Sequence, residues 1–441
     1  MPLCWKEKII GMEDLHDIAK LTETAKTQNT KEAWLALSNA LLNGVCEEDL
    51  EECRKTVNKL ERIAKTQNIH EIWCIFAESL TILAMEQDDA EKCSKTLDRL
   101  EAVARKQNKP DIWHLFAEGL LNRSCEENNT KRCTKTVDKL KVVANAQNNP
   151  EIWSLFAESL SHLALLQNDA EECGKTLDRL EVVANAQNDP AIWLIFSKAI
   201  SEQSYNDSDT EKCRKVADKL EIIAETQNSL EIWRLFADSL LELASEQKGE
   251  ECENTIAKLE IIAKTQNDRD IWATFAQTLL NQAFDQEIEE SSKIIAKLEK
   301  LATEYDDSDM WCLVAEALAT LATKQADKIK KSAMKQMVAS EEQDFKVLAE
   351  SFITLSEEKD EHTREQAINT LDGILKIENR TEIMEKFGKA LHNQIDLTDA
   401  KECLHTIERL KEIVKREDTA EIDLVFDKVK GICELLEDLT P

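Results

Sequence analysis

The stretch AEECGKTLDRLEVVANAQNDPAIWLIFSKAI, from Ala170 to Ile200, decides the fold of the chain. In its first half, Cys173, Leu177 and Leu180 recur at the spacing of one face of an α-helix. Its second half contains a second apolar face that includes Trp193. Because a helix with one apolar face must bury that face against another element, the stretch predicts a hairpin of two packed helices.

Three consecutive residues predict the turn between these helices. Asn188 is suited to end the first helix because asparagine tolerates the left-handed backbone conformation. Asp189 can cap the second helix, and Pro190 takes its first position, where no amide hydrogen is needed. Proline stands at the same position at Pro110 and Pro150, which predicts the same turn elsewhere in the chain.

The hairpin recurs along the chain with a period of 39 or 40 residues. The period is marked by the tryptophans Trp34, Trp73, Trp113, Trp153, Trp193, Trp233, Trp272 and Trp311. A Gln-Asn pair lies six residues before seven of them, and a cysteine lies twenty residues before six of them. These cysteines are Cys53, Cys93, Cys133, Cys173, Cys213 and Cys252. A fixed period of this length indicates stacked helical repeats.

The pattern becomes irregular after Trp311 but continues. Phe345, Met384 and Asp423 take the tryptophan position, and Cys403 again lies twenty residues before the last of them. We therefore predict an all-α, right-handed α-solenoid of about eleven two-helix repeats of 39–40 residues. The predicted organisation is an N-terminal cap over 1–12, regular repeats over 13–323, and divergent C-terminal repeats with a cap over 324–441.

Composition agrees with a helical chain. Eight glycines and five prolines are few for 441 residues, and β-rich proteins need both for their turns. No apolar run reaches the roughly 18 residues of a membrane span, and the start has no signal-peptide core. Thirteen cysteines, an odd number without an export signal, favour reduced thiols. We expect a soluble protein of the reducing cytoplasm.

The charge narrows the range of partners. The chain carries 87 acidic and 56 basic residues, a formal net charge of -31. Non-specific binding to nucleic acid or to an anionic membrane depends on clustered lysine and arginine. We therefore expect neither nucleic acid nor membrane among the partners.

The turn and the second helix resemble a known family. The run NPEIWSLFAESLSHLA, from Asn149 to Ala164, is similar to HEAT and armadillo repeats, which carry an Asp-Pro-Glu-Val turn followed by an Ala-rich helix. The period also fits that class. The resemblance covers about residues 13–435. It implies an α-solenoid whose second helices line the concave surface, and it implies no single function.

The tryptophan and cysteine rows fit packing better than chemistry. Tryptophans could stack bases and cysteines could hold a metal, but each tryptophan precedes another apolar residue by three positions, and the chain has no Cys-x-x-Cys pair. Buried cysteine behaves as a small hydrophobic residue. No Gly-rich phosphate loop, GxSxG or HExxH motif is present, and His70-Glu71 is the one His-Glu dipeptide, whereas HEAT-like di-iron hydroxylases use several. We predict no enzyme, no metal and no cofactor.

Acidic residues recur on the outward stripe of the second helices. Five of the eight residues at the fifth position after the tryptophan are acidic and one is lysine, and amides are interspersed. Armadillo importins bind extended basic peptides with a comparable combination. The predicted partner-binding residues are Glu78, Glu118, Asn122, Glu158, His162, Glu202, Asp238, Glu242 and Glu316. The alternative interpretation is a solvated polar face on an acidic protein.

The first helices carry basic residues at two fixed positions, fourteen and eighteen residues before the tryptophan. Acidic rows flank them, which predicts a ladder of ion pairs between stacked repeats. A separate lysine cluster stands where the repeat pattern fails, and we interpret it as a possible second docking site or as a transition to the C-terminal cap. Its members are Lys324, Lys328, Lys330, Lys331 and Lys335.

These features favour a non-enzymatic scaffold that binds a basic peptide or a basic protein surface along an acidic concave groove. The first alternative is a regulatory or architectural subunit that docks through the divergent segment 324–441. An enzyme of a HEAT-like family is the second alternative.

Overall fold

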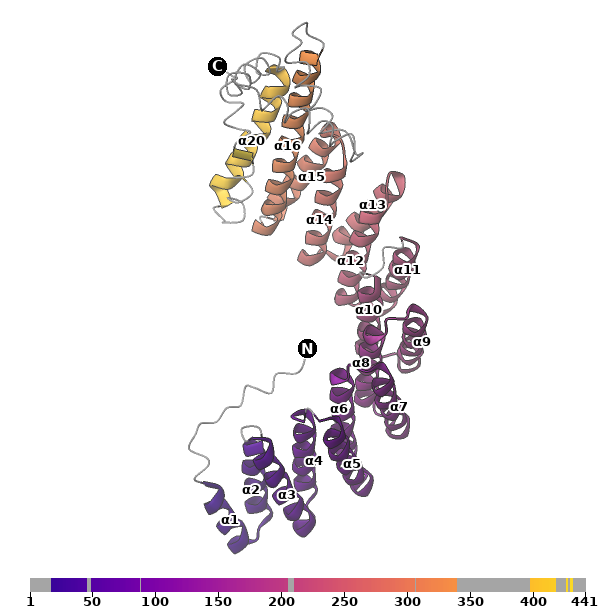
Figure 1. Cartoon of the computed structure of the whole chain (residues 1–441), viewed down its shortest axis with the longest axis vertical. Coiled ribbons are helices and arrows are strands. Elements are labelled where there is room, and N and C mark those ends of the chain that lie inside the picture. The colour runs from indigo at the N-terminus through magenta and orange to yellow at the C-terminus, as the bar shows by residue number, and fades with distance from the viewer. Residues whose placement is uncertain are drawn as a thin grey trace, which may run out of the picture. The chain divides into compact units, whose positions relative to one another are not determined.

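The computed structural model describes residues 17–45, 49–87, 89–204, 210–305, 307–338, 397–417, 426 and 429–430. All regular secondary structure in these residues is α-helical, which confirms the all-α class. The chain forms two compact units, residues 1–235 and residues 236–441, and helix α12 contains the boundary. In each unit, consecutive helices pack against their neighbours as expected for a helical repeat stack (Figure 1).

Sixteen of the described helices alternate along the chain as the first and second helices of successive repeats. The first helices are α1 (Asp17–Gln28), α3 (Leu50–Gln67), α5 (Ala90–Gln107), α7 (Thr130–Gln147), α9 (Ala170–Gln187), α11 (Thr210–Gln227), α13 (Glu250–Gln266) and α15 (Ile288–Tyr305). The second helices are α2 (Lys31–Val45), α4 (His70–Met85), α6 (Pro110–Glu126), α8 (Pro150–Leu166), α10 (Pro190–Ser204), α12 (Leu230–Glu246), α14 (Arg269–Asp285) and α16 (Ser308–Val338). The remaining helix is α20 (Leu397–Glu417).

The asparagine of each Gln-Asn pair ends the first helix, as predicted. Asn188 has φ 48° and ψ 38°, the left-handed conformation, and its amide donates to the carbonyl of Ala184. Six further asparagines at the same repeat position have φ between 48° and 51°. The asparagine has a second role in some repeats, where the indole of the next tryptophan donates to its side chain, as from Trp73 to Asn68 at 3.2 Å. The same hydrogen bond is present at Trp34 and Trp113, so in these three repeats the spacing between asparagine and tryptophan brings the two side chains together.

We expect Asn188→Ala to lower the free energy of unfolding of its hairpin by about 1–2 kcal/mol. Alanine has a Cβ but no short polar side chain that could hydrogen-bond locally, so the left-handed conformation is strained. Urea denaturation together with hydrogen exchange of α9 measures the loss. Asn188→Gly is the matched control and should remain close to wild type, since glycine adopts this conformation without strain. Equal stabilities for the alanine and glycine variants would contradict the explanation.

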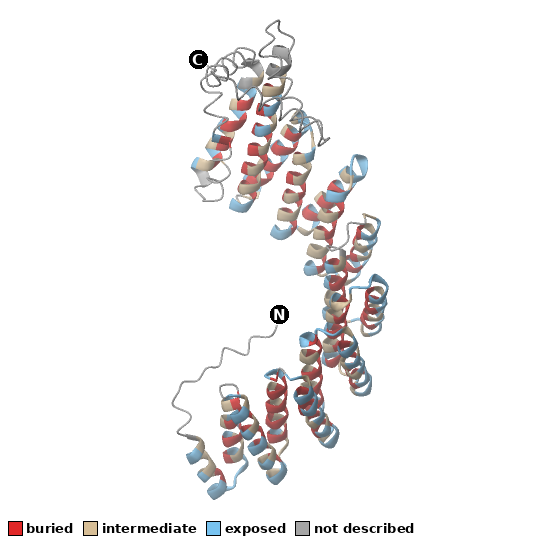
Figure 2. Ribbon diagram, viewed as in Figure 1, coloured by how far each residue is buried: buried red, intermediate tan, exposed pale blue. Residues whose placement is uncertain are grey.

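The second helices build the core of each unit. In unit 1, α2, α4, α6, α8 and α10 each pack directly on the next in this series, and in unit 2, α14 packs on α16. Within each unit, Figure 2 shows buried residues along the second helices. Trp113 is 7 % exposed, and Phe116, three residues later, is fully buried with its ring edge against the indole at a centroid distance of 6.0 Å. The tryptophan row is therefore packing, as predicted.

The cysteine row also lies mostly in the interior, and of its six members Cys252 is half-buried. Cys53, Cys93, Cys133, Cys173 and Cys213 are buried. The thiol of Cys133 donates to the carbonyl of Ser124 at 3.5 Å, at the end of the preceding repeat. The cysteine thus joins successive repeats, which confirms its predicted packing role.

The predicted ion-pair ladder connects the first helices. Lys139 of α7 lies 2.7 Å from the Glu101 carboxylate of α5, and its ammonium lies 5.2 Å from the centroid of the Phe116 ring. The same relation between repeats recurs at Arg99–Glu61, Lys219–Glu181 and Lys297–Glu260, at 3.0, 2.8 and 2.6 Å. These basic side chains of the first helices therefore pair with glutamates of the preceding first helix. Lys139, Lys219 and Lys297 also place their ammonium groups over core phenylalanine rings.

Helix α20 takes the place of the first helix that should follow α16. The thiol of Cys403 donates to the carbonyl of Ala322 on α16 at 3.4 Å, as Cys133 does to the repeat before it. Arg409 lies 2.7 Å from Glu299 of α15, so the ion-pair ladder also continues to α20. Phe345 and Met384, where intervening units were predicted, lie outside the described residues. A helix about eighty residues away in sequence thus makes the contacts of the next repeat.

Candidate binding face on the second helices

Three of the predicted binding residues of unit 1 lie at one helical position of consecutive second helices. Glu78 is on α4, Glu118 on α6 and Glu158 on α8, and we call these three residues the acidic row. Glu78 and Glu118 are half-buried, and Glu158 is exposed. Because α4, α6 and α8 pack directly on one another, the repeat brings the three carboxylates to the same face of the stack.

Partial burial disfavours the negative charge of two residues of the acidic row, Glu78 and Glu158. Burial raises the pKa of Glu78, and the nearby charge of Glu118 raises it further. Burial also raises the pKa of Glu158. Carboxylates that have lost part of their hydration and repel one another gain when a cation binds between them.

Histidines lie beside the acidic row. The hydrogen bond between His114 and Glu118, with 3.4 Å between Nε2 and Oε1, raises the pKa of His114 against the opposing effect of burial. Burial lowers the pKa of His162 and so favours its neutral form. His162 and Asn122 are half-buried, whereas Glu202 on α10 is exposed. The structure thus places these residues on the second helices as predicted, with uncharged groups among the carboxylates.

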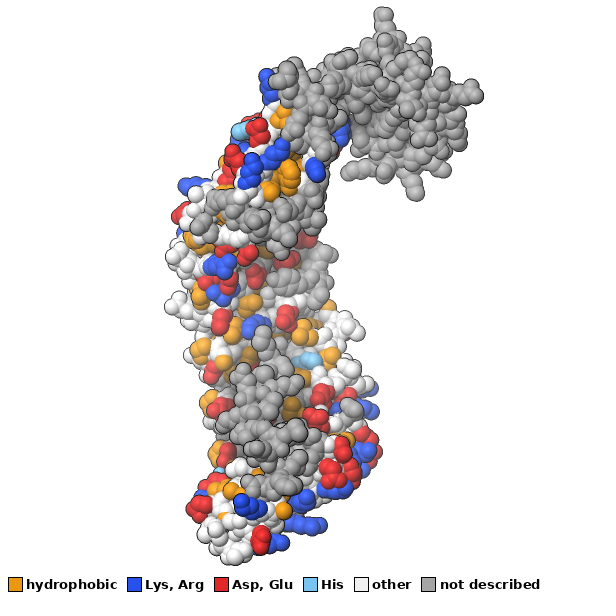
Figure 3. Space-filling model, turned by 90° about the vertical axis from the view of Figure 1, so that its left-hand side faces the viewer, with side chains coloured by type: hydrophobic (Ala, Val, Ile, Leu, Met, Phe, Trp, Pro, Cys, Tyr) orange, Lys and Arg blue, Asp and Glu red, His pale blue; other side chains and the backbone are white. Residues whose placement is uncertain are grey.

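In unit 2, Asp238 and Glu242 lie one turn apart on α12, and Glu316 lies on α16. Burial raises the pKa of Asp238, although a 3.0 Å hydrogen bond from the Thr274 hydroxyl opposes this effect. Burial also raises the pKa of Glu242, together with the charges of Glu246 and Asp238. On the face turned to the viewer in Figure 3, acidic and basic side chains are interspersed with hydrophobic and uncharged ones.

The lysine cluster is engaged in part with the chain itself. Lys324 donates to the backbone carbonyls of Ala283, Phe284 and Gln286 at 3.1, 2.7 and 2.7 Å, where α14 ends. Lys328 lies 3.3 Å from Asp399 of α20. Lys330 and Lys331 are half-buried on α16, and the side chain of Lys335 lies outside the described residues. Lys324 and Lys328 thus hold the junction between repeats, a role that the sequence did not indicate.

Two further features were missed at the sequence level. The first is a row of exposed aliphatic side chains eleven residues before the tryptophan, with Val142, Val182 and Ile222 in unit 1 and Ile261 in unit 2 exposed by 62–67 %. The fixed offset could have revealed this row, because the residue after each of them is buried. The second is a cluster of His70, Cys74 and Asp111 in unit 1, whose Cys74 is not in the cysteine row.

The cluster joins two repeats. His70 and Cys74 lie one turn apart on α4, and Asp111 lies in the first turn of α6. Burial and the hydrogen bond to Asp111 raise the pKa of the Cys74 thiol to about 12. Burial acts to raise the pKa of Asp111, but the hydrogen bonds and charge of its two partners outweigh this effect and lower it. Without a bound cation, Cys74 is a thiol that donates to a carboxylate.

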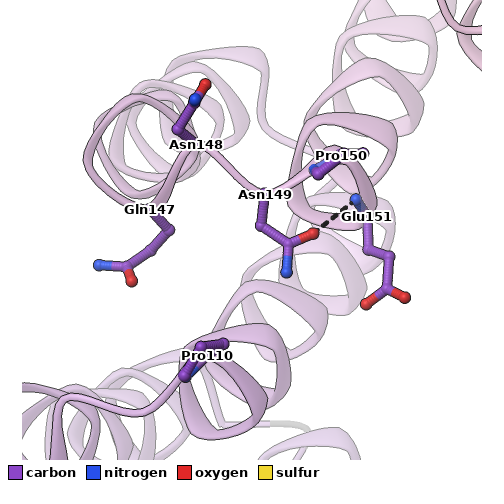
Figure 4. Close-up of a pocket in the computed structure, with 6 residues that line it drawn as sticks. All are labelled: Pro110, Gln147, Asn148, Asn149, Pro150 and Glu151. Atoms are coloured by element: carbon purple, nitrogen blue, oxygen red, sulfur yellow. Dashed lines mark hydrogen bonds between the residues drawn. The ribbon is translucent and has the colours of Figure 1, made fainter.

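A pocket of about 440 Å³ lies beside the turn between α7 and α8 (Figure 4). Its lining is Pro110, Gln147, Asn148, Asn149, Pro150 and Glu151. The Asn149 side chain accepts a hydrogen bond from the amide of Glu151 at 2.8 Å and so caps α8. Turn residues that cap helices and a single carboxylate form this pocket, and it offers no set of convergent catalytic groups.

No family model matches the chain, and no curated protein sequence matches it. The structure shows that the chain is an all-α protein built of helical repeats. Among the described residues, no helix is both long and apolar enough to cross a membrane.

Proposed function

We propose that this chain is a non-enzymatic scaffold of the HEAT/armadillo type that works in the reducing cytoplasm and binds an extended basic segment of another protein. The acidic row supports this proposal most directly. It repeats a carboxylate at one helical position of three helices packed in succession, and partial burial raises the pKa of Glu78 and Glu158, an effect that a bound cation would oppose. The interspersed amide and imidazole groups can bond a peptide backbone.

The repeat spacing indicates which basic segment fits. Packed helices lie roughly 8–10 Å apart, and an extended chain rises about 3.3 Å per residue. Every third residue of an extended peptide therefore meets successive carboxylates. A segment with arginine or lysine at every third position would pair with Glu78, Glu118 and Glu158 in turn. Each pair contributes little alone, so affinity depends on several contacts at once.

We expect the charge reversal of the acidic row, Glu78, Glu118 and Glu158→Lys, to weaken binding of such a peptide at least tenfold, or about 1.4 kcal/mol. The measurement is fluorescence anisotropy with a labelled peptide that carries arginine at every third position, at low and moderate salt. A peptide of equal composition with arginine at every second position tests the register and should bind more weakly.

The control variant reverses the same number of charges elsewhere in unit 1. Glu51, Glu91 and Glu171 stand at one repeat position of first helices α3, α5 and α9, and their side chains are 67–80 % exposed. If reversal of these residues weakens binding as much as reversal of the acidic row, only net charge matters. Full binding by the acidic-row variant would reject this face and favour the alternative of docking through residues 324–441.

A further inference from the structure

The three donor atoms of the cluster on α4 and α6 converge on one point. His70 Nε2 lies 2.8 Å from Asp111 Oδ2, and Cys74 Sγ lies 3.2 Å from the same oxygen. Cys74 Sγ lies 3.6 Å from His70 Nε2, which is the nearer ring nitrogen. One nitrogen, one sulfur and one oxygen thus form a small triangle between two repeats.

This triangle fits a tetrahedral zinc ion. Bonds of about 2.3 Å to sulfur and about 2.0–2.1 Å to nitrogen and oxygen, at tetrahedral angles, separate the ligand atoms by roughly 3.3–3.6 Å. The two separations to sulfur, 3.2 and 3.6 Å, are within a few tenths of these values. The third, 2.8 Å, is a hydrogen bond that a metal ion would replace, so a small side-chain rotation completes the geometry.

The chemistry of the donors selects the class of ion. Imidazole and thiolate ligands suit zinc and its first-row neighbours, whereas magnesium and calcium require oxygen ligands. The spacing of histidine and cysteine four residues apart places both donors on one face of α4. We propose that His70, Cys74 and Asp111 form a binding site for a divalent transition metal of the zinc class, with the fourth coordination position open to solvent.

Comparison with other repeats shows what is particular to this one. The pair that corresponds to His70–Asp111 is an ion pair of Lys31 with Glu71 in the preceding repeat, and a pair of Arg269 with Asp309 in unit 2. Leu35 stands at the position of Cys74 in the preceding repeat. A polar pair at these two positions therefore recurs at two other junctions between repeats, whereas the combination of nitrogen, sulfur and oxygen donors occurs here.

Binding has a defined proton balance. The thiol proton of Cys74 leaves for solvent as the metal–sulfur bond forms. His70 binds through Nε2, so the Nε2 proton that it donates to Asp111 without the metal passes through solvent to Nδ1, which carries the proton of the bound neutral imidazole. The Asp111 carboxylate binds as it is. The side chains of His70 and Asp111 are 41 and 51 % exposed, so the ion and the released proton have a path to water.

The experiment titrates the reduced full-length protein with Co²⁺, which reports a metal–thiolate bond through its sulfur-to-metal charge-transfer absorption, and then displaces it with Zn²⁺. We expect the charge-transfer absorption in wild type and its disappearance on addition of Zn²⁺. Cys74→Ser should abolish the component due to this site. His70→Ala and Asp111→Asn should weaken Co²⁺ binding at least about 100-fold, since loss of even an outer-shell partner costs 10–100-fold.

Cys312→Ser is the matched control. Cys312 also directly follows the tryptophan of its repeat, but Ser308 stands at the position of His70. This variant should bind Co²⁺ like wild type, and circular dichroism should confirm that all variants remain helical. The proposal is overturned if Co²⁺ gives no thiolate absorption, or if Cys74→Ser binds like wild type. No peptide enters the assay, so its outcome is independent of the proposed scaffold function.

Discussion

Phe116→Ala is expected to destabilise unit 1 by about 3–5 kcal/mol, the usual cost of removing a buried aromatic ring. Phe116 is fully buried on α6, with the Trp113 indole against its edge and the Lys139 ammonium over its face. The substitution removes the ring that connects the second helix of one repeat with the first helix of the next. Neighbouring helices can close only part of the resulting cavity because each is held by further repeats.

Urea denaturation followed by segment-resolved hydrogen exchange measures this loss, since a repeat array does not always unfold in a single step. Phe116→Leu should cost clearly less because it retains most of the buried volume. Val142→Ala is the surface control and should lie within about 0.5 kcal/mol of wild type, because Val142 is 65 % exposed. A Phe116→Ala variant as stable as Val142→Ala would refute the assigned core.

Leu410→Ala is expected to destabilise unit 2 by about 2–5 kcal/mol. Leu410 is fully buried on α20, which packs against α16. It lies seven residues after Cys403, as Leu180 lies seven residues after Cys173. If α20 makes the contacts of the repeat after α16, the loss must extend to α15 and α16 as well as to α20.

Hydrogen exchange is the decisive measurement here. Amides of α15 and α16 should exchange faster in Leu410→Ala, while those of α5 to α8 should not change. Glu408→Ala serves as the control because Glu408 is exposed on the same helix. If Leu410→Ala speeds exchange in α20 alone, then α20 does not stabilise its neighbours and its place in the stack is wrong.

The local architecture could be predicted in detail from the sequence. Asn188 ends its helix in the left-handed conformation, and Pro190 begins the next, because both properties belong to single residues and their backbones. The burial of Phe116 and Cys133 follows from periodicity alone, since a repeat that exposes one apolar face must cover it with its neighbour. The acidic row was located by the same counting, because residues at one repeat position share a face.

Only part of the candidate binding face could be predicted from the sequence. A count of charges gives the positions of Glu78 and Glu118 but not their half-burial, which depends on how closely α4 and α6 pack. The pairing of His114 with Glu118, and the raised pKa that results, likewise depends on side-chain geometry. The capping of three carbonyls by Lys324 could not be inferred, since a lysine on a helix is expected to be solvated.

The sequence by itself determined the hairpin, its period and the residues that face the core, because these depend on helix periodicity and on the conformational preferences of single residues. Only the tertiary structure decided which distant segments meet. It brought α20 to α16 and Glu299, and it brought Asp111 of one repeat to His70 and Cys74 of another. Such contacts depend on the distance and angle between packed helices, which many side chains set together and which no single position in the sequence encodes.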